Sequence, residues 1–448
     1  MLSRSSLLPV AALSIGTIWS LAFESTVAQT TDRWVLVHAG QLLDRPGRTP
    51  RSPATLLIRN ERIEAVRDGL RDSSAFAGVP ADVTVLDLSH RFVLPGLIDS
   101  HVHLNTDRAG IERQLARVAE STADAAYEAA VNARKTLAAG FTTVRNLGDP
   151  EGVILALRDA IAEDKLPGPR ILDSGRSIST TSGHMDGTLG YREELHPMIE
   201  ERANTCDGAD ACRRAVRKQI ARGADLIKIA TTGGVNSPIG LGLGRQMFDD
   251  EARAIVETAH LYGKKVAVHA HGADGIALAL AAGADSIEHG TLLDDAGIEL
   301  FRRTGAYYVP TLSTVNGYIE RLGRNPDAYT PEVRSKIEWR IGITGKSLEQ
   351  AVPRGVKIAF GTDAGVSMHG RNADEFELMV KHGMTPEQAI VAATVNAADL
   401  LGIAQLVGTL EPGKQADLIA VDGNPLEDVT VLKEVELVMK DGKVFEQD

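Results

Sequence analysis

Histidines at the ends of apolar segments give the first indication of chemistry in this chain. His101 and His103 close the apolar run 93–104 and are two positions apart, so in a strand both side chains point to one face. His269 and His271 repeat this spacing at the end of another apolar run. Imidazole nitrogens bind zinc and related divalent ions. The two pairs therefore suggest a metal-dependent hydrolase, provided that other segments supply further ligands.

Three more potential ligands, Lys228, His289 and Asp363, stand in or after other apolar segments. Each has an ordinary alternative role: a lysine that extends to the surface, a packed histidine, or an aspartate that caps a helix. All of them, together with the two histidine pairs, fall at the same end of five separate segments. This agreement favours one shared site over five unrelated roles.

The elements that must position these side chains are eight short apolar strands. We expect them at 93–104, 140–147, 170–174, 225–230, 265–270, 285–290, 307–312 and 356–361. Helical stretches alternate with them, for example at 123–139, 250–262 and 275–282. This alternation predicts an α/β fold with a (β/α)₈ TIM-type barrel over residues 96–400, whose active site lies at the carboxyl ends of the strands. A longer polar stretch, 316–350, predicts an extra helix or lid.

Both ends of the chain contain further short strands outside this alternation. Residues 29–95 hold several of them, and residues 401–448 include a hairpin around Asp441-Gly442, a dipeptide typical of tight β-turns. We expect the two ends to form one small β-sandwich domain, with the barrel inserted between them.

Residues 1–28 have the composition of a secretory signal peptide. Arg4 precedes a mostly apolar run, 7–23, and Thr26-Val27-Ala28 supplies small residues for cleavage. The alternative is a retained anchor helix, which the shortness of the run and the interruption at Pro9 disfavour. We therefore expect a periplasmic or secreted mature protein. No later segment is long and apolar enough to span a membrane, so no membrane partner is expected.

Bulk composition limits the remaining function classes. The 448 residues are 43% hydrophobic and 24% charged, as in ordinary globular proteins, and the formal net charge is −12. A negative balance argues against a nucleic-acid partner, since phosphate binding needs a basic face. The two cysteines, Cys206 and Cys212, lie close together in a polar stretch. They could form a small-loop disulfide in an oxidising compartment or remain two unrelated thiols.

The residue types also suggest how a pair of metal ions would work. Two close ions need a bridging ligand with two oxygens, which Lys228 could provide only after carboxylation by CO₂. Carboxylation would also remove the cost of a buried ammonium beside two cations. A hydroxide held between the ions would be the nucleophile, since metal binding lowers the pKa of water. Asp363 would bind one ion and carry the proton to the leaving nitrogen.

On these residues the chain resembles the members of the amidohydrolase superfamily that have binuclear metal centres, and Zn²⁺ is the expected metal. The ligand set of that family falls on His101, His103, Lys228, His269, His289 and Asp363. The resemblance implies that His101 and His103 share one ion with Asp363. It implies that His269 and His289 hold the second ion, with carboxylated Lys228 between the two.

Three stretches, 183–187, 231–235 and 361–365, resemble the Xaa-Pro dipeptidase and imidazolonepropionase-related group of this superfamily. Lys228 argues against imidazolonepropionase itself, which resembles a one-metal variant. The resemblance implies a carboxypeptidase or dipeptidase that acts on peptidyl or N-acyl amino acids. Some such enzymes hydrolyse the amide of ochratoxin A, and homo-oligomers are common among them.

Substrate contacts are expected from His184, Thr232, Gly233, Val235 and His271. By resemblance His184 would polarise the scissile carbonyl or bind substrate, with a surface loop histidine as the alternative. His271 would contact substrate or support a metal ligand. Tyr191 and Arg192 offer a site for a substrate carboxylate, or else face solvent.

The expected function is an exported binuclear zinc amidohydrolase that cleaves the C-terminal amide bond of dipeptides or N-acyl amino acids. A deaminase or cyclic-amide hydrolase on the same scaffold is the alternative enzyme. A non-catalytic scaffold protein is the alternative of another class, and the complete ligand set argues against it.

Overall fold

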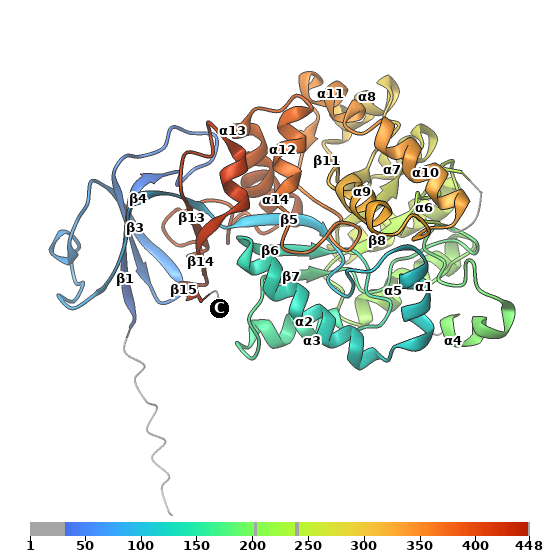
Figure 1. Cartoon of the computed structure of the whole chain (residues 1–448), viewed down its shortest axis with the longest axis horizontal. Helices are drawn as coiled ribbons and strands as arrows, with labels where there is room; N and C mark the ends of the chain where they lie inside the picture. The colour runs from blue at the N-terminus through green and yellow to red at the C-terminus, as the bar shows by residue number, and fades with distance from the viewer. Residues whose placement is uncertain (1–31, 201–203, 238–241, 447–448) are drawn as a thin grey trace, which may run out of the picture. The chain divides into compact units, whose positions relative to one another are not determined.

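The computed structural model describes residues 32–200, 204–237 and 242–446, so the expected signal peptide at 1–28 lies outside the described residues. Within these ranges the chain is an α/β protein with one mixed sheet and two parallel sheets (Figure 1). Among the described helices none combines the length and apolar composition that a membrane span requires.

The mixed sheet joins the two ends of the chain. Its order is β15-β14-β13-β4-β1-β2-β3. The strands are β1 (Trp34–Leu42), β2 (Ala54–Arg59), β3 (Arg62–Asp68), β4 (Thr84–Pro95), β13 (Leu418–Val421), β14 (Val435–Lys440) and β15 (Lys443–Phe445). Strand β13 pairs antiparallel with β4, so Ala420 lies opposite Val93. The predicted hairpin is confirmed: Asp441 and Gly442 both have positive φ, at 48° and 69°, as a type I′ turn requires.

The two parallel sheets hold the eight predicted strands of the central region. Their orders are β5-β6-β7 and β12-β11-β10-β9-β8. The strands are β5 (Leu97–Val102), β6 (Phe141–Asn146), β7 (Arg170–Asp173), β8 (Ile227–Ala230), β9 (Val266–Ala270), β10 (Ser286–His289), β11 (Tyr307–Val309) and β12 (Lys357–Ile358). Isolated parallel bridges, Ile178 with Ile229 and Val102 with Ala364, connect the two sheets at both ends.

Strand β12 is shorter than the predicted run 356–361. Its ladder ends because the N–H of Phe360 donates to the carbonyl of Ala392, 3.0 Å away, and not to a neighbouring strand. Ser100 N in turn donates to Phe360 O at 2.9 Å, which keeps this segment beside β5.

Helices follow most of these strands in chain order (Figure 1). They are α1 (Gly110–Ala119), α2 (Thr122–Ala138), α3 (Ile154–Ala162), α4 (His196–Glu200), α5 (Ala209–Ala221), α6 (Asp249–Leu261), α7 (Ala273–Ala282), α8 (Asp295–Thr304), α9 (Thr314–Arg324), α10 (Pro331–Gly342), α11 (Lys346–Ala351), α12 (Asp374–Lys381), α13 (Pro386–Val391) and α14 (Ala397–Leu401). Helix α2 starts at a Ser121 capping box, and α7 ends at Gly283, whose φ is 95°. The polar stretch 316–350 forms α9, α10 and α11.

Successive side chains along the buried strands point alternately to the packed apolar core and to the site. Ile227 and Ile229 belong to the large apolar cluster shared with the helices, so Lys228 between them points to the opposite side of the sheet. In the strand register, Lys228 pairs with Ala267, and His269 pairs with Glu288. Residues paired in register, or two apart along a strand, share one face, so these polar side chains converge.

The close cysteine pair forms the disulfide that was one of the two sequence alternatives. Cys206 is bonded to Cys212 at the start of α5, with their Cα atoms 4.9 Å apart. The N–H of Cys206 donates to Ser179 O at 2.8 Å, and the Ser179 hydroxyl accepts from Met185 N at 3.3 Å. The disulfide loop thereby supports the segment that carries His184.

Candidate metal centre and substrate cavity

The first expected pair of ligands lies next to Asp363. His101, at the end of β5, is 1% exposed, and its Nε2 is 3.4 Å from Oδ1 of Asp363. Nε2 of His103 is 3.2 Å from the same oxygen. These three side chains come from two distant segments, and they converge because His101 O accepts the Asp363 N–H at 2.7 Å.

The buried carboxylate of Asp99 holds the two segments that carry these side chains together. Oδ1 of Asp99 accepts the N–H of His101 at 3.0 Å and that of Thr362 at 3.1 Å. Its Oδ2 accepts from the Thr362 hydroxyl at 2.6 Å and from Asn372 Nδ2 at 2.8 Å. Burial raises the pKa of Asp99 to about 6, although these donors act in the opposite direction. Asp99 therefore sets the relative position of β5 and the segment that ends in Asp363.

His289 completes a compact group of potential ligands. One ligand atom from each of His101, His289 and Asp363 lies within 4.8 Å of the others, a spacing that could hold a metal ion. His289 and Asp363 have positive φ angles of 71° and 57°, which non-glycine residues rarely adopt. Such backbone strain concentrates at functional sites. The Thr311 hydroxyl lies 2.7 Å from His289 Nδ1, which leaves Nε2 for the group.

His269 and two further histidines extend the cluster. The ring centroid of His269 is 4.7 Å from that of His289 and 4.1 Å from that of His184. The ring of His271 stacks on His289 at 5.1 Å, and its Nδ1 lies 2.8 Å from the Thr291 hydroxyl. The structure thus brings both His-x-His pairs, His289 and Asp363 together.

Burial keeps five of the imidazoles neutral, which is the state that binds metals: those of His101, His184, His269, His271 and His289. It lowers the pKa of His101 to about 4 and that of His184 to about 3, with the charge of Lys228 as the second cause in each case. It also lowers the pKa values of His269, His271 and His289 well below the ordinary value. The ring nitrogens are therefore available as lone-pair donors at neutral pH.

Lys228 lies at the centre of this cluster without a partner. Its side chain is 1% exposed, and Nζ has no hydrogen-bond partner among the described residues. Burial lowers its pKa to about 8, although Glu288 and Asp363 oppose the shift. A buried ammonium without hydrogen bonds is costly. The unpaired Nζ therefore fits the expected carboxylated lysine, whose two oxygens would turn an isolated cation into a bridging ligand.

A buried ion pair behind His101 was not anticipated from the sequence. Oε2 of Glu288 is 2.9 Å from His101 Nδ1, and Oε1 accepts from Arg145 at 2.8 Å and from the Ser286 hydroxyl at 2.5 Å. Burial opposes ionisation of Glu288, yet Arg145 and His101 bring its pKa to about 2. Glu288 immediately precedes His289. Strand alternation could have placed it on the face of His269, had the strand register been known.

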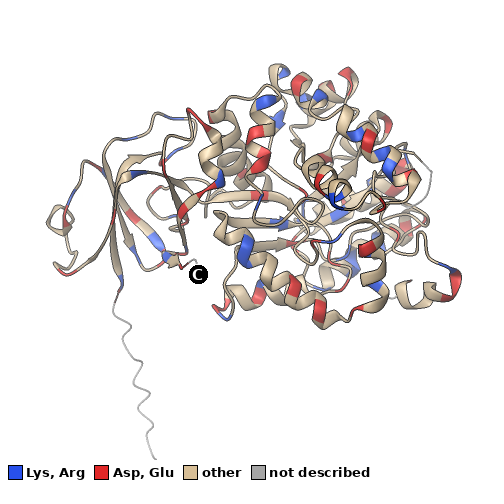
Figure 2. Cartoon of the chain, viewed as in Figure 1, with Lys and Arg blue, Asp and Glu red and all other residues tan. Residues whose placement is uncertain are grey.

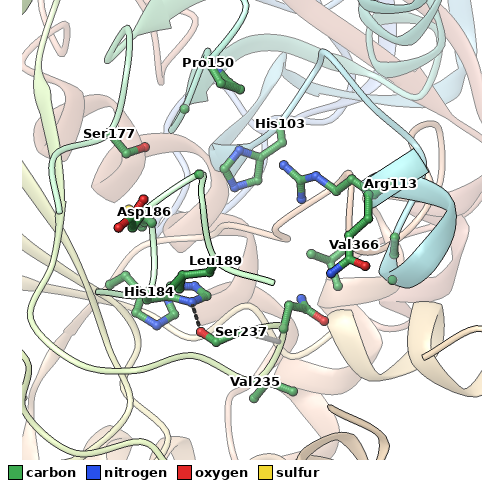
Figure 3. A pocket seen from close by; sticks show the side chains of 18 of the residues that line it. His103, Arg113, Pro150, Ser177, His184, Asp186, Leu189, Val235, Ser237 and Val366 are labelled. Atoms are coloured by element: carbon green, nitrogen blue, oxygen red, sulfur yellow. Dashed lines mark hydrogen bonds between the residues drawn. The ribbon is translucent and has the colours of Figure 1, made fainter. Parts of the chain in front are cut away.

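Of the expected substrate contacts, some line the cavity and others support the histidines from behind it. Nδ1 of His184 lies 2.6 Å from the Ser237 hydroxyl, and its ring faces the cavity (Figure 3). Val235 also lines the cavity. Thr232 supports the site from behind, because its hydroxyl accepts the His271 N–H at 3.0 Å. The Gly233 carbonyl lies 3.4 Å from His269 Nε2.

These side chains surround a cavity of about 260 Å³ that reaches all six expected ligands. Tyr191 lines it and donates its hydroxyl to Gln114 O at 2.9 Å, whereas the Arg192 side chain is 76% exposed and lies near Glu194. Arg192 therefore takes the solvent-facing alternative. Arg113, on α1, points into the cavity toward His103 (Figure 3).

Comparisons with known proteins agree with this geometry. The amidohydrolase family model matches residues 92–445. Ochratoxinase of Aspergillus niger is 33% identical over 444 residues, which cover 94% of this chain and 88% of that protein. A crystal structure of a Xaa-Pro dipeptidase with bound methionine in the active site is 40% identical, with a TM-score of 0.85, over 92% of this chain and 100% of that chain.

A prolidase complexed with n-methylphosphonate-l-proline is 30% identical, with a TM-score of 0.83, and the match covers 93% of this chain and 100% of that chain. The family match extends over most of the sequence and contains every expected ligand. The chain belongs to the amidohydrolase family and is a hydrolytic enzyme that acts on C–N bonds.

Proposed function

We propose that the protein is an exported binuclear zinc amidohydrolase that cleaves the C-terminal amide bond of dipeptides or N-acyl amino acids. The observation that carries this proposal is Nζ of Lys228, which is buried and unpaired among the described residues and lies amid the histidine cluster. A deaminase of the one-metal type would not need a lysine in this position.

The architecture that we propose is a closed (β/α)₈ barrel over 96–400, inserted in a small β-sandwich domain formed by 29–95 and 401–448. The parallel bridges between the two sheets support closure. The mixed sheet shared by both chain ends supports the split domain. Export rests on the signal-like composition of 1–28, and assembly into a homo-oligomer rests on the family resemblance.

Amidohydrolases are metal-dependent, and the donor set here suits two divalent ions. We assign His101, His103 and Asp363 to one ion, and His269 and His289 to the other. Carboxylated Lys228 would contribute an oxygen to each. When bound, the ions would supply Lewis-acid chemistry, because they polarise the scissile carbonyl and lower the pKa of water.

The chain's own residues then move the proton. Asp363 accepts a proton from the attacking water, whose oxygen bonds to the carbonyl carbon. The C–N bond breaks, and Asp363 delivers the proton to the leaving nitrogen, which gives a carboxylic acid and an amine. Burial would raise the pKa of Asp363, but its contacts with His101 and His103 hold it at about 2, so the side chain starts as a carboxylate that can accept a proton. His184, held by Ser237, is placed to orient the scissile carbonyl.

The relatives support the substrate class. One is named ochratoxinase, one is a Xaa-Pro dipeptidase that holds methionine, and one is a prolidase that holds a phosphonate of proline. An enzyme that cleaves an amide next to a free carboxylate would account for all three names.

The test is a substrate screen of the purified, zinc-loaded protein. The panel contains Xaa-Pro dipeptides, N-acyl amino acids and ochratoxin A, with cyclic amides and aminopurines as the alternative classes. Metal analysis of the same preparation should give about two ions per chain. Cleavage confined to cyclic amides, release of ammonia from the purines, or one ion per chain would reject the proposal. Failure to cleave any compound of the panel would reject the proposed substrate class.

A further inference from the structure

The substrate cavity has a charge character opposite to that of the chain. The formal net charge is −12, and acidic and basic residues are spread along the helices (Figure 2). The cavity lining nevertheless includes more basic than acidic groups: Arg113, Arg117, Arg176, Arg340 and Lys228 against Glu151, Asp186 and Asp363. An excess of one sign of charge in a cleft attracts ligands of the other sign. The lining therefore points to an anionic substrate.

Arg340 is the most deeply buried of these cations. It lies on α10 and is 3% exposed. NH1 donates to the Thr344 hydroxyl at 3.1 Å, and this is its only side-chain hydrogen bond within the described residues. No carboxylate of those residues lies within ion-pair distance of it. A guanidinium has five N–H donors in a fixed planar fork, so most of its hydrogen-bonding capacity is unused.

A buried guanidinium with unused N–H donors destabilises the protein unless a ligand accepts hydrogen bonds from it. A buried charge is normally paired or hydrogen-bonded, and Arg stays protonated because its pKa is too high for it to neutralise. Burial lowers the pKa of Arg340, but a guanidinium group stays protonated in proteins. A carboxylate matches the fork with two parallel hydrogen bonds, which a surface lysine or a lone hydroxyl cannot offer.

The surroundings of Arg340 hold it in place at the cavity wall. Lys336, one turn earlier on α10, donates to the carbonyl of Gly234 at 3.1 Å and to that of Ser237 at 2.6 Å. Val333, one further turn back, lines the cavity and packs in an apolar cluster with Val235. One face of helix α10 thus lines the cavity in a fixed position, and His271 and Asp363 line the same cavity.

We propose that Arg340 binds the free α-carboxylate of the substrate and so selects amides whose leaving amine is an amino acid. This inference rests on the proposed function and names the group that recognises its substrate. Arg113 is the competing cation, since it also lines the cavity and burial lowers its pKa to about 10. Its side chain is partly exposed on α1, whereas Arg340 is 3% exposed, and a charge nearer to water is screened more strongly.

The experiment compares two substrates that differ only in the carboxylate, N-acyl-phenylalanine and the N-acyl amide of 2-phenylethylamine. We expect Arg340→Met to lower kcat/KM for the acid on the order of 100-fold, because truncating one member of a buried charge pair costs several kcal/mol. The value for the decarboxylated analogue should stay within about threefold of wild type. Arg340→Lys should give an intermediate loss for the acid, since it keeps the charge but not the fork.

Arg334→Met is the matched control, because Arg334 lies on the same helix, is 47% exposed and pairs with Glu338. It should preserve the preference for the acid. Equal losses on both substrates in Arg340→Met would overturn the proposal in favour of a structural role. If Arg113→Met loses the preference for N-acyl-phenylalanine over the decarboxylated analogue and Arg340→Met keeps it, the residue that binds the carboxylate is Arg113.

Two outcomes keep the tests separate. If wild type cleaves neither dipeptides nor N-acyl amino acids, the proposed function itself fails. If Arg340→Met does not fold, calorimetric binding of free phenylalanine to wild type and to Arg340→Lys decides. Weaker binding to the lysine variant supports the proposal, and equal affinity contradicts it.

Discussion

Nδ1 of His101 and Oε2 of Glu288 lie 2.9 Å apart, and neither side chain is more than 1% exposed. The contact occupies one ring nitrogen, so Nε2 is the nitrogen that faces Asp363. Arg145 holds the other carboxylate oxygen at 2.8 Å and donates through Nε to Ser100 O at 2.5 Å. The orientation of a proposed metal ligand therefore depends on an ion pair between β6 and β10.

Glu288→Gln tests this dependence. The amide keeps the shape of the carboxylate but removes its charge, so His101 loses a strong orienting partner and Arg145 is left buried without a carboxylate. Loss of such a partner commonly lowers metal affinity about 10- to 100-fold. Competition with a zinc chelator measures the affinity. Glu299→Gln, at a 63% exposed residue paired with Arg302, is the control. Unchanged affinity in Glu288→Gln would remove the orienting role.

Lys228→Ala tests the bridging ligand. We expect the metal content to fall from about two ions per chain and activity to fall with it, because the carboxylated lysine would contribute a ligand to each ion. Millimolar acetate or propionate should restore part of both, since a small carboxylate fits the space left by the side chain. Lys218→Ala, at an exposed position of α5, should change neither. Full metal content and full activity in Lys228→Ala would refute the role.

Most strand positions could be predicted because buried parallel strands are continuous apolar runs. The potential ligands could be predicted because they stand at the ends of those runs, as His101 and Asp363 do. The disulfide stayed open at the sequence level, since proximity along the chain does not fix the geometry of the thiols. The structure pairs Cys206 with Cys212.

The residues that sequence reasoning missed depend on tertiary packing. Arg145 and Glu288 are 143 positions apart, and a buried ion pair between separate strands has no local signature. Arg340 lies in the predicted polar stretch, but which face of α10 meets the cavity is decided by contacts such as that of Lys336 with Ser237. Both cases are charges in the interior, where composition alone predicts apolar residues.

Asp173 should make the stability of the fold depend on pH. Burial, and then the nearby Asp149, raise its pKa to about 8, whereas an unfolded aspartate has a pKa of about 3.9. Between roughly pH 4 and pH 8 the folded state therefore holds a proton that the unfolded state has lost. Stability must fall as pH rises through this window.

Urea unfolding at pH 5, 6.5 and 8 measures this loss. Asp173→Asn mimics the protonated side chain, so its unfolding free energy should fall less from pH 5 to pH 8, by about 1 kcal/mol or more. Asp164→Asn, at a 73% exposed residue paired with Lys443, should follow the wild type. Identical pH profiles for wild type and Asp173→Asn would show that Asp173 is ionised in the folded protein.

Asp363→Asn separates proton transfer from metal binding. The Asp363 backbone N–H donates to His101 O at 2.7 Å, and this contact does not need the carboxylate, so the fold should be kept. The amide oxygen can still serve as a ligand, but the side chain can no longer accept a proton. We expect kcat to fall about 10²- to 10⁴-fold while the metal content stays near wild type. Asp327→Asn, at an exposed residue before α10, is the control and should leave kcat unchanged. Metal loss in proportion to activity would make Asp363 a ligand only, and near-normal turnover would exclude it from proton transfer.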